Sequence, residues 1–327
     1  MDLRTIIAAA SLAPAALPAL AAGAAENYPV RPIRIVVTYV PGGNTDNVAR
    51  LVSPRLTEQL GQSIVIDNRG GAGGVVGTEI AAHSAPDGYT LLFGTSAGLS
   101  INPLLHAKLP YDVDRDFAPV SLLVVIPQLM VAYPGLPAKN VAEFLKLARA
   151  QPGKINYASV GVGSPNHLGM ELLKSMTGID IVHVPYKGSS PAVIDLIAGN
   201  VSVFFSSIPV MLQHVKAGRL RALGVGGAKR SPAAPDIPTV AESGVPGFEY
   251  ETWYGLFVPS RTPRAIVARL NDAVVKSLHS AQLEQQLRSQ GADPRPSTPE
   301  EVAAFMKVER ARWEKVVKTT GLAKSLP

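Results

Sequence analysis

Two glycine-rich segments carry the residues that could bind a negatively charged ligand. The first, Pro41-Gly42-Gly43-Asn44-Thr45-Asp46, follows a β-branched run and precedes apolar residues at helical spacing. The second, Gly161 to His167, also lies between an expected strand and an expected helix. Backbone N–H groups at a helix N-terminus favour anions, and glycine lets a ligand approach the main chain. An ordinary tight turn between a strand and a helix would give the first pattern as well.

A third segment matches an enzyme motif. Gly94-Thr95-Ser96-Ala97-Gly98 fits the nucleophile elbow G-x-S-x-G and follows an expected strand, so a secreted serine hydrolase using Ser96 is the alternative function. Such an enzyme needs a helix directly after the serine, then an acid and a late histidine. We expect Asn102-Pro103 to interrupt that helix, and His279 falls in an expected amphipathic helix. The sequence therefore favours a protein without catalytic residues.

Cofactor and metal motifs are not evident. The glycines of Gly71 to Gly77 have the wrong spacing for G-x-G-x-x-G, and no His, Asp and Glu residues have metal-ligand spacing. The absence of cysteine excludes disulfides and a thiol nucleophile. We expect neither a cofactor nor a metal.

The elements that position these segments form two successive α/β runs. Strands are expected at 35–37, 63–67 and 89–93, with helices between them, which predicts a parallel sheet covered on both faces. Apolar runs at 120–126 and 128–132 are split by Pro127, where we place the first crossing between domains. A second series has strands at 155–159, 181–184, 201–205 and 219–225. Further β character at 248–258 and helices at 263–280 and 299–319 complete the chain.

Composition fits an exported globular protein. The chain has 327 residues, of which 46% are hydrophobic, enough for two domains or one large one. Residues 1–24 read as a signal peptide, with Arg4 in a short n-region, an apolar stretch, and Ala22-Gly23-Ala24 as the cleavage site. The net charge of +6 is scattered, without a basic helix face interleaved with aromatic residues, so we expect no nucleic-acid partner.

A series of motifs in fixed order resembles one known family, the Bug (TctC-like) extracytoplasmic solute-binding proteins of tripartite tricarboxylate-type uptake systems. The resemblance runs from about residue 28 to the C-terminus. The motifs are Arg31-Pro32-Ile33-Arg34 with the first glycine loop, Asn68-Arg69-x-Gly71-Ala72-Gly73-Gly74, Pro86-Asp87-Gly88-Tyr89-Thr90-Leu91-Leu92, Ile101-Asn102-Pro103, Val182-His183-Val184-Pro185-Tyr186-Lys187-Gly188 and Trp253-Tyr254-Gly255.

The resemblance implies an α/β, two-lobed fold of the periplasmic-binding-protein type II (Venus flytrap) class. A cleft would separate the lobes, and the C-terminal helices would pack on lobe 1. The expected segments are 1–24 for the signal peptide, 25–127 and 250–327 for lobe 1, and 128–249 for lobe 2. The resemblance also implies a monomeric periplasmic receptor that captures a small carboxylate. Its partner would be the permease subunits of a tripartite tricarboxylate transporter, or a sensor kinase.

The family's ligand loops map onto residues of both lobes. They are Tyr39, Gly43, Asn44, Asp46, Thr95 and Ser96 in lobe 1, and Ser159, Gly163, Ser164, His167, Tyr186 and Ser206 in lobe 2. Asp46 is expected to cap its helix or order water, and a histidine placed like His167 is often a structural hydrogen-bonder. Many family members have an acidic residue where this chain has Ser206. Because serine cannot balance a cation, we expect a ligand without an amino group.

Overall fold

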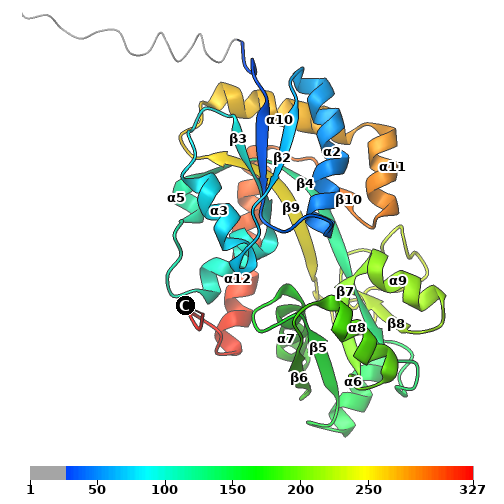
Figure 1. Cartoon of the computed structure of the whole chain (residues 1–327). Helices are drawn as coiled ribbons and strands as arrows, with labels where there is room; N and C mark the ends of the chain where they lie inside the picture. Colours follow the sequence, from blue (N-terminus) through cyan, green and yellow to red (C-terminus); the bar gives the residue numbers. More distant parts are fainter. Residues whose placement is uncertain (1–26, 327) are drawn as a thin grey trace, which may run out of the picture.

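Strand β4 (Phe117–Ala132) joins the two halves of the molecule (Figure 1). The computed structural model describes residues 27–326, so the predicted signal peptide, residues 1–24, lies outside the described residues. Up to Pro127, β4 pairs antiparallel with β9 (Glu251–Pro259). From Gln128 onward it pairs with β7 (Val203–Ser207) and β8 (Arg221–Val225). The two apolar runs of the sequence are therefore one continuous strand that serves two sheets.

Pro127 lies where β4 changes partners. A proline has no N–H to donate to a sheet, so it is tolerated where the ladder is interrupted. On this pairing we propose that the chain crosses from lobe 1 to lobe 2 between Pro127 and Gln128. The return crossing that we propose lies between Tyr250 and Glu251, because the Tyr250 N–H still donates to Gly226 of lobe 2.

Lobe 1 is a mixed sheet covered by helices on both faces. Its strand order is β2-β1-β3-β9-β4, and β1 is parallel to both β2 and β3, as the alternation in the sequence predicts. One face is covered by α2, α10 and α11, and the other by α3, α5 and the first half of α12 (Figure 1). The bounds are β1 Ile33–Val37, β2 Ile64–Asn68, β3 Thr90–Thr95, β10 Asp293–Pro294, α2 Asn44–Leu60, α3 Val75–Ala82, α5 Val113–Asp116, α10 Arg264–Leu278 and α11 Ala281–Ser289.

Lobe 2 repeats the arrangement around the other end of β4. The strand order continues β4-β7-β5-β6, and β5 is parallel to both of its neighbours. Helices α6 and α7 cover one face, and α8 and α9 cover the other. The bounds are β5 Asn156–Ser159, β6 Val182–Pro185, α6 Val141–Ala150, α7 Pro165–Thr177, α8 Ser189–Ala198 and α9 Ile208–Lys216.

The last helix, α12 (Pro299–Thr319), extends over both lobes. Val302 and Met306 pack in the lobe 1 core, whereas Trp313 and Val316 pack in the lobe 2 core. The expected packing of the C-terminal helices on lobe 1 is therefore present in α10 and α11, and α12 adds a contact with lobe 2. Within residues 27–326, none of the helices is long and apolar enough to cross a membrane.

Glu251 lies at the proposed return crossing, in register with Pro127. Burial has the largest effect on its carboxyl group and raises its pKa to about 7. Neighbouring Glu249 and Asp293 raise the pKa further, whereas Arg295 and Arg312 lower it. The folded protein therefore holds a proton on this group at pH values where an unfolded chain has released it.

We predict that Glu251 makes the protein less stable as the pH rises from about 4.5 to about 7. Across this interval the folded state binds more protons than the unfolded state, so the free energy of unfolding falls, by at most about 3 kcal/mol. The side chain of Glu251→Gln cannot ionise, so this variant should lack the part of the pH dependence of stability that Glu251 causes. Thermal melts of both proteins between about pH 5 and about pH 8 measure it. Glu58→Gln, at an exposed glutamate of α2, is the control, and equal slopes in all three proteins would contradict the assignment.

Candidate ligand-binding cleft

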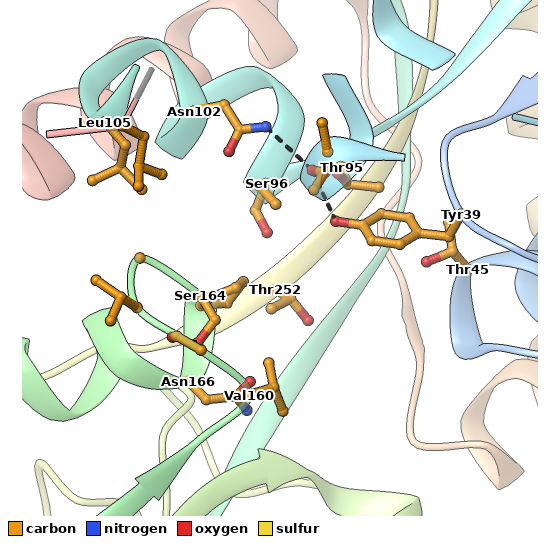
Figure 2. A pocket seen from close by; sticks show the side chains of 18 of the residues that line it. Tyr39, Thr45, Thr95, Ser96, Asn102, Leu105, Val160, Ser164, Asn166 and Thr252 are labelled. Carbon is orange, nitrogen blue, oxygen red and sulfur yellow. Dashed lines mark hydrogen bonds between the residues drawn. The ribbon is translucent and has the colours of Figure 1, made fainter. Parts of the chain in front are cut away.

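A cleft of about 660 Å³ opens between the two lobes (Figure 2). Ser96 of lobe 1 and Ser164 of lobe 2 lie on opposite sides of the space. Lobe 1 contributes Tyr39, Thr45, Ala72, Gly73, Thr95, Ser96, Ala97, Asn102, Leu105, His106, Thr252, Tyr254 and Leu326, and lobe 2 contributes Val160, Gly161, Val162, Gly163, Ser164, Pro165, Asn166 and Ser189.

Most of the lining surface is apolar, and its polar side chains are hydroxyl groups, the amides of Asn102 and Asn166, and the imidazole of His106. Among the described residues that line the cleft there is no Asp, Glu, Lys or Arg. Burial raises the pKa of Tyr254 to about 12 and also raises the pKa of Tyr39, so both phenols are neutral hydrogen-bond donors near pH 7. An ammonium group would find no carboxylate partner on this surface. An anion would meet neutral donors instead.

The lobe 1 wall is built where β3 ends. Thr95 is the last residue of β3, and Ser96 precedes the π-helical turn η2 (Ala97–Ile101), which continues into α4 (Asn102–Leu105). The Thr95 hydroxyl accepts a hydrogen bond from the Gly98 N–H at 3.2 Å. The first N–H groups of a helical turn have no acceptor within it, and Thr95 satisfies one of them here.

A main-chain carbonyl holds two further lobe 1 side chains in place. The Tyr39 hydroxyl and the Asn102 side-chain amide both donate to the Gly73 carbonyl, at 3.4 and 3.2 Å (Figure 2). Gly73 belongs to the short helical turn η1 (Ala72–Gly74) in the second glycine-rich stretch of lobe 1. This stretch therefore orients two cleft residues.

The lobe 2 wall is the loop that leads into α7. Ser164 caps the helix by accepting from the His167 N–H at 3.3 Å, and its own hydroxyl donates to the Gly161 carbonyl at 2.6 Å. The Gly163 N–H donates to Nδ1 of His167 at 3.1 Å and is therefore already engaged. The N–H groups of Val162 and Asn166 make no hydrogen bond to another described residue, so they are the main-chain donors of this loop that remain for a ligand.

Five of the predicted site residues line the cleft, namely Tyr39, Thr95, Ser96, Gly163 and Ser164. Their contact with a ligand stays a prediction. The other seven, Gly43, Asn44, Asp46, Ser159, His167, Tyr186 and Ser206, lie outside the lining in this structure.

In lobe 1, the residues outside the lining hold the first glycine loop. Asp46 is buried, and its carboxylate accepts hydrogen bonds from the Gly42 N–H, Arg50 and Asn68. Burial alone would raise the pKa of Asp46, but these hydrogen bonds outweigh it and the pKa lies below its ordinary value. Asp46 is thus a structural anion, and Gly43 is the N-cap residue of α2.

Asn44 reaches toward the other lobe. Its side-chain amide donates to the Ser207 hydroxyl at 3.3 Å, which gives a direct hydrogen bond between α2 and the end of β7. Ser206, the neighbour of Ser207, is 5% exposed within β7 and paired in register with Leu129. Ser206 lies outside the cleft lining, and its effect on the charge of the ligand stays a prediction.

In lobe 2, the residues outside the lining support the loop from behind. The ring of His167 stacks on that of His183 with centroids 4.0 Å apart, and Ser159 Oγ lies 2.6 Å from Nε2 of His183. Burial lowers the pKa of His167 to about 4, so its Nδ1 is an acceptor near pH 7. The Tyr186 hydroxyl donates to Asp195 at 2.7 Å.

Several cleft residues are not among those predicted from the sequence. Asn102 and Tyr254 belong to motifs that mark the family, Ile101-Asn102-Pro103 and Trp253-Tyr254-Gly255. Asn166 lies inside the second loop and is anchored through its side-chain amide to the Phe205 carbonyl at 2.6 Å. Leu326 reaches the cleft from the far end of the chain, and no local pattern marks it.

The arrangement around Ser96 differs from the sequence expectation in one respect. A helical segment does follow Ser96 directly, because Pro103 falls in the first turn of α4, where its missing N–H costs no hydrogen bond. His279, however, follows α10 and its ring bonds to the Val275 carbonyl, away from the cleft lining. The described residues therefore bring no acid and late histidine to Ser96.

A buried carboxylate lies behind the lobe 1 wall. Glu309 of α12 is 4% exposed and accepts hydrogen bonds from Ser100 Oγ at 2.8 Å, from Trp313 Nε1 at 3.2 Å and from Trp253 Nε1. Ser100 belongs to η2, and Trp253 lies in β9 between the cleft residues Thr252 and Tyr254. Glu309 therefore ties together two segments that form the wall. Burial raises its pKa above the ordinary value.

The fold and the cleft define a class of protein, and comparisons with known proteins specify the family. Two α/β lobes around a shared crossing, with a ligand-sized cleft between them, are the architecture of type II periplasmic binding proteins. Residues 48–322 match the tripartite tricarboxylate transporter family receptor. The chain therefore belongs to this TctC/Bug family of solute-binding receptors, as its motifs predict, and is not an enzyme.

Relatives align along most of their length. BugT of Bordetella pertussis is 39% identical over 91% of both chains. Among solved structures, Rpa4515 of R. palustris with adipate is 40% identical, with a TM-score of 0.80 over 91% of this chain and 99% of that one. MatC from Rhodopseudomonas palustris with bound malate is 37% identical, with a TM-score of 0.75 over 89% of this chain and 100% of that one. The expected two-lobed α/β fold is thereby confirmed.

We predict that Glu309→Ala destabilises the protein by about 3 kcal/mol, because it removes the acceptor of three buried donors. Urea unfolding followed by circular dichroism measures the loss. Glu314→Ala is the matched control, since Glu314 lies on the same helix, is half exposed and pairs with Lys318 at the surface. The control should change little, and similar losses in both variants would refute the role of Glu309.

Proposed function

We propose that this protein is a periplasmic receptor that captures a small carboxylate without an amino group and delivers it to a tripartite tricarboxylate-type permease. The observation that carries the proposal is the donor set of the cleft, whose described lining offers hydroxyl groups and main-chain N–H groups but no Asp or Glu side chain. Ser96 on one wall, and the N–H groups of Val162 and Asn166 on the other, supply donors to carboxylate oxygens.

Charge balance favours an acid over an amino acid. A buried ammonium group needs an acceptor or a counter-charge, and leaving it unpaired costs several kcal/mol. A carboxylate can be satisfied by neutral donors at helix starts, which also carry partial positive charge. Adipate and malate, with which the structures of two relatives are described, are both carboxylates without an amino group.

Delivery to a permease fits the rest of the chain. The predicted signal peptide, residues 1–24, would export the protein to the periplasm. The two lobes would close on the ligand as a monomer, and the closed form would dock on membrane permease subunits. A ligand can shift the balance between open and closed forms only by its difference in affinity for the two.

A thermal-shift comparison of glutarate with glutamate tests the ligand class. The two compounds differ only by the amino group, and succinate with aspartate forms a second pair. The mature chain, residues 25–327, is first unfolded and refolded to remove any ligand bound during expression. At a hundredfold excess over the dissociation constant, a bound acid should stabilise the protein by about 2.7 kcal/mol.

We expect glutarate or succinate to raise the melting temperature and glutamate and aspartate to leave it unchanged. Glutaramide, in which both carboxylates are replaced by neutral amides, is the control for the requirement for negative charge. An equal rise with glutamate would show that the cleft accommodates an ammonium group and would contradict the proposal.

A further inference from the structure

The segment after α12 folds back onto lobe 1. The Lys324 N–H donates to the Leu104 carbonyl and the Leu326 N–H to the Leu105 carbonyl, both at 3.0 Å. The Ala107 N–H donates to the Leu326 carbonyl at 2.9 Å. Both main-chain polar groups of Leu326, its N–H and its carbonyl, are therefore hydrogen-bonded. The segment is therefore a fixed part of the wall rather than a loose end.

The Leu326 side chain meets lobe 2 at the cleft. Leu105 and Leu326, which we call the leucine wall, both line the cleft and face Gly163. A Cβ atom built on Gly163 would lie 2.7 Å from Cδ1 of Leu105 and 3.7 Å from Cδ1 of Leu326. The leucine wall thus closes the gap between α4 of lobe 1 and the Gly161–Ser164 loop of lobe 2.

The leucine wall is an apolar part of the site that contributes no hydrogen-bond donor from its side chains. Hydroxyl and N–H donors lie on the serine-bearing loops, whereas the two leucine side chains offer only hydrocarbon. A carboxylate pressed against them would lose its hydration without gaining a hydrogen bond. Methylene groups, by contrast, gain by contact with such a surface.

Leu326 is the adjustable member of the pair. Leu105 is 1% exposed and belongs to the core cluster of lobe 2 and α12, so its position is fixed by packing on many sides. Leu326 is only partly buried and packs against that cluster from outside. A change at position 326 alters the size of the cleft without opening the core.

We propose that Leu326 is a specificity-determining residue that limits the hydrocarbon length of the bound acid. This inference rests on the proposed function, because it assumes a carboxylate ligand in the cleft. Leu326→Ala removes about three carbon atoms from the wall and leaves space for additional methylene groups. Each further methylene that becomes buried should improve affinity by about fourfold.

Calorimetric titration with unbranched dicarboxylates from succinate through adipate to azelate tests the proposal on the mature chain. In Leu326→Ala, the affinity for azelate relative to adipate should rise on the order of tenfold over the native protein. Leu326→Phe, which enlarges the wall, should shift the preference toward shorter acids. Leu322→Ala is the matched control, since Leu322 lies in the same segment and packs on the same cluster but does not line the cleft.

The outcomes separate this inference from the proposed function. Binding of dicarboxylates with an unchanged length profile in both position 326 variants would overturn the role of Leu326 and leave the function intact. An equal shift in Leu322→Ala would also overturn it, because the effect would then come from the packing of the segment in general. Failure of the native protein to bind any acid in the series, while it binds another class of solute, would overturn both proposals.

Discussion

The two lobes share strand β4, and this shared strand limits how they can move. Because β4 is hydrogen-bonded to β9 in lobe 1 and to β7 and β8 in lobe 2, a change in the angle between the lobes must be absorbed where its partners change, at Pro127 and Gln128. Helix α12 adds a second constraint, since its apolar residues pack in the cores of both lobes. A bend between the lobes would therefore have to act at the two proposed crossings, and α12 would oppose it.

Buried carboxyl groups near the cleft act from behind its walls. Asp46 holds the first glycine loop through the Gly42 N–H and Asn68, and Glu309 holds η2 and β9 through Ser100 and Trp253. In lobe 2, neutral His167 performs the same task for Gly163. Each wall is stiffened by buried polar groups whose hydrogen-bonding capacity is used within the protein. The surface that meets the ligand consequently keeps its neutral donors without any competing fixed charge.

Local pattern is sufficient to predict the strand–loop–helix units. The resemblance to the family's ligand loops is what places five cleft residues, which lie where a strand ends and a helix begins. Local pattern does not predict which groups of each loop are hydrogen-bonded within the protein and which remain for a ligand. The sequence does not reveal that His167 takes up the Gly163 N–H, or that Asn44 pairs with Ser207, because these contacts depend on side-chain orientation and on segments far apart in the chain. Leu326 shows the limit most clearly, since most of lobe 2 and all of α12 lie between it and Gly163 in the sequence.

The hydrogen bonds to Glu309 also bear on the fluorescence of the protein. The chain contains two tryptophans, Trp253 and Trp313, and both indole N–H groups donate to this one carboxylate. One indole lies in the strand that carries Thr252 and Tyr254, and the other in the helix that spans the lobes. The intrinsic tryptophan emission of the protein therefore arises from a single buried location at the back of the cleft. A change in tryptophan fluorescence can therefore be assigned to this one site behind the cleft, without an added label.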